Sequence, residues 1–221
     1  MEKKIDIKEC IRFGWTTFKV RPLYFAGVFL LLFAIQFLFD QLSDDKGILN
    51  GHNALLGVAA LVSFIVSIIV DMCTRKFSLQ AHDNPQSASV RTTWVPGVMW
   101  KYAGATILVV LGVICGLILL IIPGLIFAMA LMFTLYLVLE KNLDPIAAMK
   151  ESIRMTKGYR MQLFGLSAAA VLINILGLLA LVVGLLVSIP VSMFAMAHAY
   201  RVISGTSAHT PTPEGDIIPA S

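Results

Sequence analysis

Long runs of apolar residues with almost no charge divide this chain and limit the folds open to it. A helix of about 20 apolar residues spans the roughly 30 Å hydrocarbon core of a bilayer. Of the 221 residues, 58% are hydrophobic and 14% are charged, whereas a soluble domain carries about 25% charged residues. We therefore predict an all-α, polytopic membrane protein whose six transmembrane helices form three hairpins. The predicted spans are residues 23–39, 54–70, 102–122, 125–139, 163–183 and 185–200.

Two amphipathic segments are predicted to lie on the membrane surface as helices. Residues 3–20 place apolar side chains on one helical face and basic ones on the other, and Trp15 suits the headgroup region. Residues 144–158 have the same character and carry helix boundary signals. These signals are Asp144 at the N-cap, Pro145 at the first helical position and Gly158 at the C-cap.

Lysines and arginines are distributed unequally between the predicted loops. The first loop, residues 40–53, contains only Lys46. The other basic residues lie in the N-terminal segment, in residues 71–101 and 140–162, or at Arg201. Because cytoplasmic segments carry the positive excess, we predict that both termini face the cytoplasm.

The turns between the later spans carry no charge. Pro123-Gly124 is predicted to turn the chain between the third and fourth spans, and Val183-Gly184 between the last two. Charge bias does not distinguish full spans from re-entrant hairpins at residues 102–139 and 163–200. Either arrangement returns the chain to the side from which it came.

The chain also contains a candidate internal repeat. The apolar segment that begins at Gly116 aligns with the segment that begins at Gly177 when one residue is skipped. A repeated helical hairpin is one interpretation, and chance similarity between two apolar sequences is the other. Residues 1–203 are predicted to form a single membrane domain. Residues 204–221 are rich in Pro, Gly, Ser and Thr and are predicted to form a disordered cytoplasmic tail.

Several short motifs together resemble those of a known family. They are the Ile-Pro-Gly turn, the Asp-Pro-Ile-Ala-Ala start of the segment 144–158, its close at Ser152, Thr156, Lys157 and Gly158, and the Ala-Tyr-Arg at 199–201. Over roughly residues 5–203, the chain resembles the membrane domain of glycerophosphoryl diester phosphodiesterases and related stand-alone bacterial membrane proteins. The resemblance implies a six-helix protein of the bacterial cytoplasmic (inner) membrane. It does not imply phosphodiesterase activity, because that chemistry belongs to a separate soluble barrel domain.

Polar side chains inside the predicted spans are candidates for function. Gln36, Asn174 and His198 are such residues. Gln36 and Asn174 each either bond a neighbouring helix or contact a polar substrate, whereas for His198 packing or snorkelling is favoured over proton relay or ligation. Asp40, Asp71 and Glu140 are predicted to end spans at the membrane interface. Asp71 also pairs favourably with Arg75, four residues later on a helix.

The sequence contains no pattern that indicates catalysis. The three cysteines, at positions 10, 73 and 115, form no CxxC pair, and His52, His82 and His209 are predicted to lie in loops or the tail without metal-ligand spacing. No Walker loop, GxSxG or HExxH motif is present. We therefore expect no catalytic residue, cofactor, metal or nucleic acid, and we predict that the protein is not an enzyme.

Basic residues on the segment 144–158 and just after it are the remaining candidates. Lys150, Arg154, Lys157 and Arg160 are predicted to bind anionic phospholipid or a partner protein. The alternative is that they only set membrane orientation. The favoured function is a non-enzymatic membrane scaffold or accessory protein, with homo-oligomers possible. The second hypothesis is a small transporter or lipid-handling carrier with a path between the hairpins.

Overall fold

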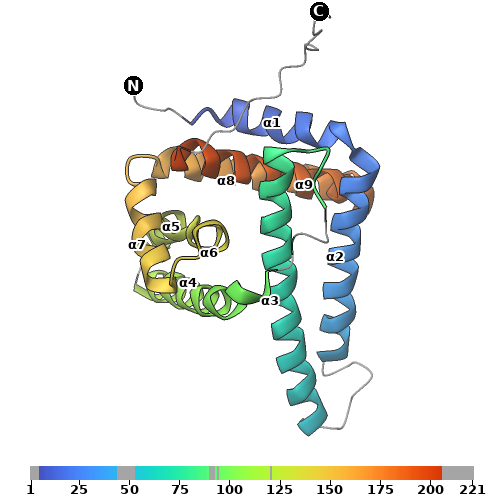
Figure 1. Ribbon diagram of the computed structural model, residues 1–221, viewed down its shortest axis with the longest axis vertical. Helices are drawn as coiled ribbons and strands as arrows, with labels where there is room; N and C mark the ends of the chain where they lie inside the picture. The colour runs from blue at the N-terminus through green and yellow to red at the C-terminus, as the bar shows by residue number, and fades with distance from the viewer. Residues whose placement is uncertain (1–4, 44–52, 90–92, 94, 120, 206–221) are drawn as a thin grey trace, which may run out of the picture.

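A computed structural model describes residues 5–43, 53–89, 93, 95–119 and 121–205. Every regular element in these residues is helical (Figure 1). The elements are α1 (Ile7–Val20), α2 (Pro22–Ser43), α3 (Asn53–Asp83), the 3-10 turn η2 (Pro96–Val98), α4 (Met99–Leu119), α5 (Ile121–Leu131), α6 (Thr134–Lys141), α7 (Pro145–Thr156), α8 (Arg160–Leu179) and α9 (Leu181–Ser204).

Six helical segments are long and apolar enough to cross a membrane. They are Pro22–Gln41, Gly57–Asp83, Met99–Ile118, Pro123–Lys141, Arg160–Leu179 and Gly184–Ser204. The predicted all-α, multi-pass fold class is therefore confirmed. Residues 44–52 of the first loop and 206–221 of the tail lie outside the described residues, and the limits of the single domain stay a prediction.

Consecutive apolar helices contact one another: α2 contacts α3, α4 contacts α5, and α8 contacts α9. Figure 1 shows that α2 and α3 lie along the long axis of the molecule, whereas α8 and α9 run across it. The three-hairpin arrangement around a common axis stays a prediction.

The amphipathic helix α1 covers α9. Its apolar face buries Cys10, Phe13 and Phe18, while Lys8 and Lys19 on the opposite face are exposed. Gly14 allows this packing, because a Cβ atom there would lie 2.4 Å from the carbonyl oxygen of Val191 in α9. The apolar face of α1 is thus used for protein packing rather than for insertion between lipids.

The second span is longer than predicted. We expected it to end at residue 70, but α3 continues to Asp83, so Asp71 and Arg75 lie inside a helix. Phe77 in the added part is buried and packs edge-on against the ring of Phe25 in α2. The helix continues past Asp71 because Arg75 neutralises the Asp71 carboxylate within the fold.

The turn predicted at Pro123-Gly124 was wrong, because both residues lie in the first turn of α5. Proline is tolerated there, since the first N–H groups of a helix have no partner within the helix. Gly124 serves close packing instead. A Cβ atom at Gly124 would lie 2.7 Å from the backbone nitrogen of Leu117 in α4.

The last predicted turn, at Val183-Gly184, was also displaced. The chain turns at Ala180, and Gly184 lies in α9, where a Cβ atom would be 2.2 Å from the carbonyl oxygen of Gly177. The glycine pairs Gly116 with Gly124 and Gly177 with Gly184 occupy aligned positions of the candidate repeat. Both pairs bring two helices into backbone contact near a turn.

The predicted fourth span, residues 125–139, is broken into α5 and α6. The break lies at Met132 and Phe133, and Phe133 is fully buried. Non-helical backbone at membrane depth requires burial in protein, because lipid offers no hydrogen-bond partners. The break frees the carbonyl oxygen of Ala130, and this oxygen accepts a hydrogen bond from α7.

Candidate functional site

Helix α7 packs on the break through its small polar residues. Ser152 Oγ donates to the carbonyl oxygen of Ala130 at 2.7 Å, and Thr156 Oγ1 lies 3.3 Å from the same oxygen. Ala148, Ser152 and Thr156 are fully buried at four-residue spacing. The Ser-x-x-x-Thr close of the segment therefore has a structural role. Ser152 supplies the main hydrogen-bond donor to this carbonyl near the end of α5, because Thr156 has a single hydroxyl hydrogen and its Oγ1 lies closer to the Ser152 carbonyl oxygen, at 2.8 Å.

The predicted start of α7 is confirmed, although Asp144 does not cap by hydrogen bonding, and the C-cap is Lys157, one residue before the predicted Gly158. Asp144 occupies the N-cap and Pro145 follows it, but the Asp144 carboxylate pairs with Lys101 of α4 at 3.1 Å. Gly158, next to the C-cap, has φ +94°, a conformation that side chains other than glycine rarely adopt. Together these residues fix where α7 begins, where it ends and how it meets α4.

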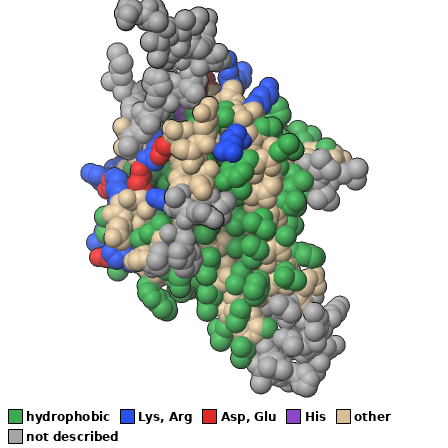
Figure 2. Space-filling view, turned by 45° about the vertical axis from the view of Figure 1, so that its right-hand side comes forward, with side chains coloured by type: hydrophobic (Ala, Val, Ile, Leu, Met, Phe, Trp, Pro, Cys, Tyr) green, Lys and Arg blue, Asp and Glu red, His purple; other side chains and the backbone are tan. Residues whose placement is uncertain are grey.

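The four predicted basic residues do not converge on one site. Lys150, Arg154 and Lys157 are exposed, whereas Arg160 is half-buried at the start of α8 and its Nε has no hydrogen-bond partner among the described residues. Lys150 lines a hollow of about 490 Å³ with Asp144 and Leu108. Figure 2 shows charged side chains at the upper and left part of one face, and hydrophobic ones over much of the rest.

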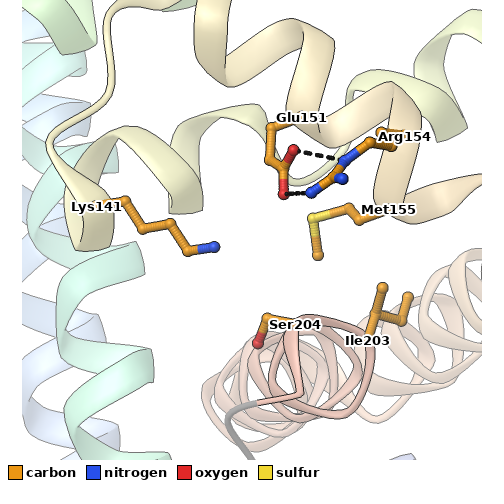
Figure 3. A pocket seen from close by; sticks show the side chains of 6 residues that line it. All are labelled: Lys141, Glu151, Arg154, Met155, Ile203 and Ser204. Atoms are coloured by element: carbon orange, nitrogen blue, oxygen red, sulfur yellow. Dashed lines mark hydrogen bonds and ion pairs between the residues drawn. The ribbon is translucent and has the colours of Figure 1, made fainter.

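Arg154 lines a smaller pocket of about 250 Å³ where the ends of α6, α7 and α9 meet. Lys141 projects into this pocket (Figure 3), and it forms no ion pair with any residue that the structure describes. Met155 and Ile203 supply an apolar wall. We call this site the basic pocket.

The charge of the basic pocket is positive overall. Arg154 donates two hydrogen bonds of 2.8 Å to Glu151, which fixes the guanidinium against the pocket. The hydrogen bond from Arg154 holds the pKa of Glu151 below its usual value, and the positive charges of Arg154 and Lys141 act in the same direction. Glu151 is thus ionised at neutral pH, and two cations against one carboxylate leave one net positive charge.

A second polar cluster surrounds Arg201 near the end of α9. Arg201 bonds Asp83 of α3 at 2.5 Å and also bonds Glu140 of α6, which accepts a further hydrogen bond from Tyr200. The Arg201 side chain is 8% exposed. Glu140 lies one residue before the end of the fourth candidate span, as predicted, and its carboxylate also links α6 to α9.

Two histidines lie beside this cluster. His82 Nε2 and His198 Nδ1 are 3.1 Å apart, and His82 Nδ1 lies 3.2 Å from an Asp83 oxygen. Phe13 of α1 stacks on the His198 ring at 4.3 Å. His82 was predicted to lie in a loop, but it is buried in the last turn of α3. His198, which was predicted to be an intramembrane polar residue, has His82 as its partner, and the residues around position 198 in the sequence do not reveal this.

Asp71 and Arg75 form the ion pair expected from their spacing. Arg75 Nε lies 3.0 and 3.1 Å from the two Asp71 oxygens, and Tyr102 of α4 donates to Asp71 Oδ2 at 2.5 Å. The Arg75 guanidinium also lies over the ring of Tyr136 in α6, 5.4 Å from its centroid. The pair therefore joins three helices inside the fold rather than ending a span.

Gln36 and Asn174 share no interaction partner with His198 among the described residues. Gln36 donates to Asp40 at 2.8 Å and lines a groove of about 560 Å³ between α2, α3 and α9. Asn174 Oδ1 is buried without a hydrogen-bond partner among the described residues. Neither Asn174 nor His198 lines the groove or the two surface hollows. The three residues therefore do not mark one path.

Sequence reasoning missed the Arg201 cluster and the histidine pair. His82 and His198 are 116 residues apart, Arg201 and Asp83 are 118 apart, and Arg201 and Glu140 are 61 apart, so no local motif joins them. The available signal was the pair His82-Asp83 together with His198 and Arg201, polar residues next to long apolar runs. No group of three or more His, Cys, Asp or Glu in the described part of the chain is arranged to hold a metal ion.

These features define an all-helical protein with six segments able to cross a membrane, internal ion pairs and a small basic pocket. Comparison with protein-family models, with curated proteins and with solved structures finds no match. The resemblance to the phosphodiesterase membrane domain therefore stays a prediction.

Proposed function

We propose that this chain is a non-enzymatic integral membrane protein, a scaffold or accessory protein whose α7 surface binds anionic phospholipid headgroups. The observation that carries the proposal is the basic pocket, where Lys141 and Arg154 face an apolar wall of Met155 and Ile203. A phospholipid offers a phosphodiester with one negative charge beside apolar chains. The negative phosphate matches the cations on one side of the pocket, and the acyl chains match the apolar wall on the other.

The wider distribution of charge supports the same surface. Lys150 is exposed on α7, and each cation near an anionic leaflet contributes about 1 kcal/mol. The excess of basic residues in the segments outside the first loop favours a cytoplasmic location for α7 and for both termini. The bacterial inner membrane and an accessory role toward a separate soluble enzyme are part of the proposal. Both follow from the family resemblance.

The alternative of a transporter or carrier receives less support. It rested on a path lined by Gln36, Asn174 and His198, and these three side chains lie in different surroundings. His198 is enclosed by His82 and Phe13. The polar groups near it bond one another, which favours a structural role for the cluster.

The test compares lipid retention by full-length protein purified in a mild detergent. Native mass spectrometry with added phosphatidylglycerol or phosphatidylcholine is expected to show preferential retention of phosphatidylglycerol. Lys141→Gln should weaken that retention about fivefold, the effect of losing about 1 kcal/mol. Glu151→Gln should strengthen it at pH 7, because it removes the only negative charge among the described residues that line the pocket.

Lys157→Gln is the matched control, since Lys157 is an exposed cation just after α7 that lines neither hollow. The retention of phosphatidylglycerol by this variant should stay within about twofold of the parent protein, as expected for a solvent-exposed, screened charge outside the pocket. Equal retention of the two lipids would refute the proposal. An effect of Lys157→Gln equal to that of Lys141→Gln would show that general surface charge, and not the pocket, attracts the lipid.

A further inference from the structure

The groove between α2, α3 and α9 is lined by the first half of α9, from Leu185 to Met193, whereas the basic pocket lies at the end of α9, at Ile203 and Ser204. Its volume of about 560 Å³ falls within the range of about 300–1,000 Å³ typical of small-molecule sites. Most of its lining is apolar, and Leu30 and Phe33 at its edge are 48% and 62% exposed. In a membrane this edge faces lipid, so an apolar molecule enters the groove from the side.

The polar side of the groove consists of groups that accept hydrogen bonds. Ser67 donates its hydroxyl hydrogen to the Phe64 carbonyl at 2.8 Å, and Thr74 donates its own to the Val70 carbonyl at 2.7 Å. Asp71, as a carboxylate, has acceptors only. A ligand that satisfies these oxygens must therefore supply a donor.

Asp71 has acceptor capacity to spare. Its Oδ2 accepts from Tyr102 and from Arg75 Nε, whereas Oδ1 receives only a share of the same Arg75 hydrogen at 3.1 Å. A carboxylate offers about four acceptor positions. The Asp71 side chain is 36% exposed and lines the groove, so its remaining lone pairs are open to a ligand.

The charge around the groove selects an uncharged donor. Asp71 is neutralised by Arg75, and no other charged residue among those that the structure describes lines the groove. An alkylammonium ion gains no net attraction from a neutral pair and loses its hydration on entry. A hydroxyl loses much less hydration and still donates to the carboxylate.

We infer that this groove binds a lipid alcohol of the diacylglycerol type, with its acyl chain along the apolar wall and its hydroxyl donating to Asp71. The site is independent of the basic pocket and of the proposed headgroup binding. Gln36 uses one of its two amide hydrogens on Asp40, so it adds to the same groove an acceptor oxygen for the hydroxyl and one amide hydrogen for an ester carbonyl of the lipid. A neutral lipid with a donor satisfies both the apolar and the polar lining.

The test uses two ligands that differ only in the donor. Full-length protein in detergent is mixed with 1,2-dioleoylglycerol or with its 3-O-methyl ether, and retention is measured by native mass spectrometry. The alcohol should be retained about tenfold more strongly than the ether, as expected for a hydrogen bond to a charged group. Equal retention of the two would show adventitious packing of acyl chains only and would overturn the inference.

Two tryptophan substitutions locate the site. Ile189→Trp fills the groove from α9 without touching the Asp71 pair, and it should abolish selective retention of the alcohol. Leu172→Trp on the exposed side of α8 is the matched control and should leave retention unchanged. Unchanged selectivity in Ile189→Trp would overturn the inference. So would displacement of the alcohol by dodecylammonium at equal concentration, because charge would then govern binding.

Discussion

Arg201 shows how a single side chain holds charge inside this fold. It lies between the carboxylates of Asp83 and Glu140, and it is the only lysine or arginine that bonds either one among the described residues. Without it, two carboxylates from different helices face each other in partly buried surroundings. Removing one partner of such an arrangement leaves uncompensated charge, which typically costs about 3–5 kcal/mol.

Arg201→Gln is therefore expected to destabilise the protein strongly. The measurement is the midpoint of thermal unfolding in detergent, and the control is Arg154→Gln, which breaks an exposed pair on α7. The control should hardly move the midpoint, because exposed ion pairs contribute little. If both variants unfold at the parent temperature, the Arg201 cluster is not structural.

Ser152 and Thr156 act on one carbonyl. Ser152→Ala combined with Thr156→Val keeps the size of both side chains nearly constant but removes the donors to the Ala130 oxygen. A buried acceptor without a partner costs about 1–3 kcal/mol. We expect a lower unfolding midpoint and faster hydrogen exchange in α5 and α6. Thr16→Ala is the control, since its exposed hydroxyl bonds only carbonyls of its own helix.

At the scale of elements, close backbone contact joins α4 to α5 and α8 to α9. Each contact uses one glycine from each helix, at positions that the sequence alignment of the two segments also matches. Small residues at helix interfaces allow the backbone approach on which packing in membranes depends. The matching contacts support a repeated unit, since chance similarity of apolar sequence gives no reason for the same contact at the same place.

Gly184→Ala is predicted to separate α8 from α9. The new methyl group would lie 2.2 Å from the Gly177 carbonyl oxygen, so one helix must move, at a cost of about 1–3 kcal/mol. Gly27→Ala in α2 meets no atom within 4 Å and should instead stabilise by about 0.5–1 kcal/mol, because alanine favours helix. Thermal unfolding of both variants gives effects of opposite sign. A loss of stability in Gly27→Ala equal to that in Gly184→Ala would contradict the packing explanation.

At the scale of the whole molecule, hydropathy predicted where apolar helices occur but not how they end. The predicted 163–183 and the observed Arg160–Leu179 largely coincide, since lipid-facing segments reveal themselves by composition. The extension of α3 past Asp71 was missed because a charge that ends a span and a charge neutralised inside the fold look alike in sequence. The break at Met132 and Phe133 was missed for a related reason. Its compensating donors come from α7.

The candidate site, like the fold, was predictable from the sequence only in part. Lys150, Arg154 and Lys157 were predicted to be exposed on one surface, and periodicity was sufficient for that. The pocket also needs Lys141 and Ile203, whose positions depend on how α6 and α9 pack against α7. The histidine pair depends on packing between α3 and α9, which no spacing rule in the sequence specifies.

The crossing of the membrane by α8 and α9 decides the topology of the whole chain, and it is testable at the turn between them. Helix α8 has 20 residues, which at about 1.5 Å each is close to the roughly 30 Å hydrocarbon core. We therefore expect Ala180, exposed at the turn, to reach the side opposite to α7. A re-entrant hairpin would leave it within the membrane.

The experiment introduces Ala180→Cys into a variant whose three native cysteines are replaced by alanine. A membrane-impermeant maleimide applied to intact cells should label this cysteine. Lys157→Cys, exposed just after α7, is the matched control and should react only after the membrane is opened. Absence of labelling at position 180 in both intact and opened cells would indicate a re-entrant hairpin. Labelling of Lys157→Cys in intact cells would reverse the orientation, because the positive excess would then lie outside.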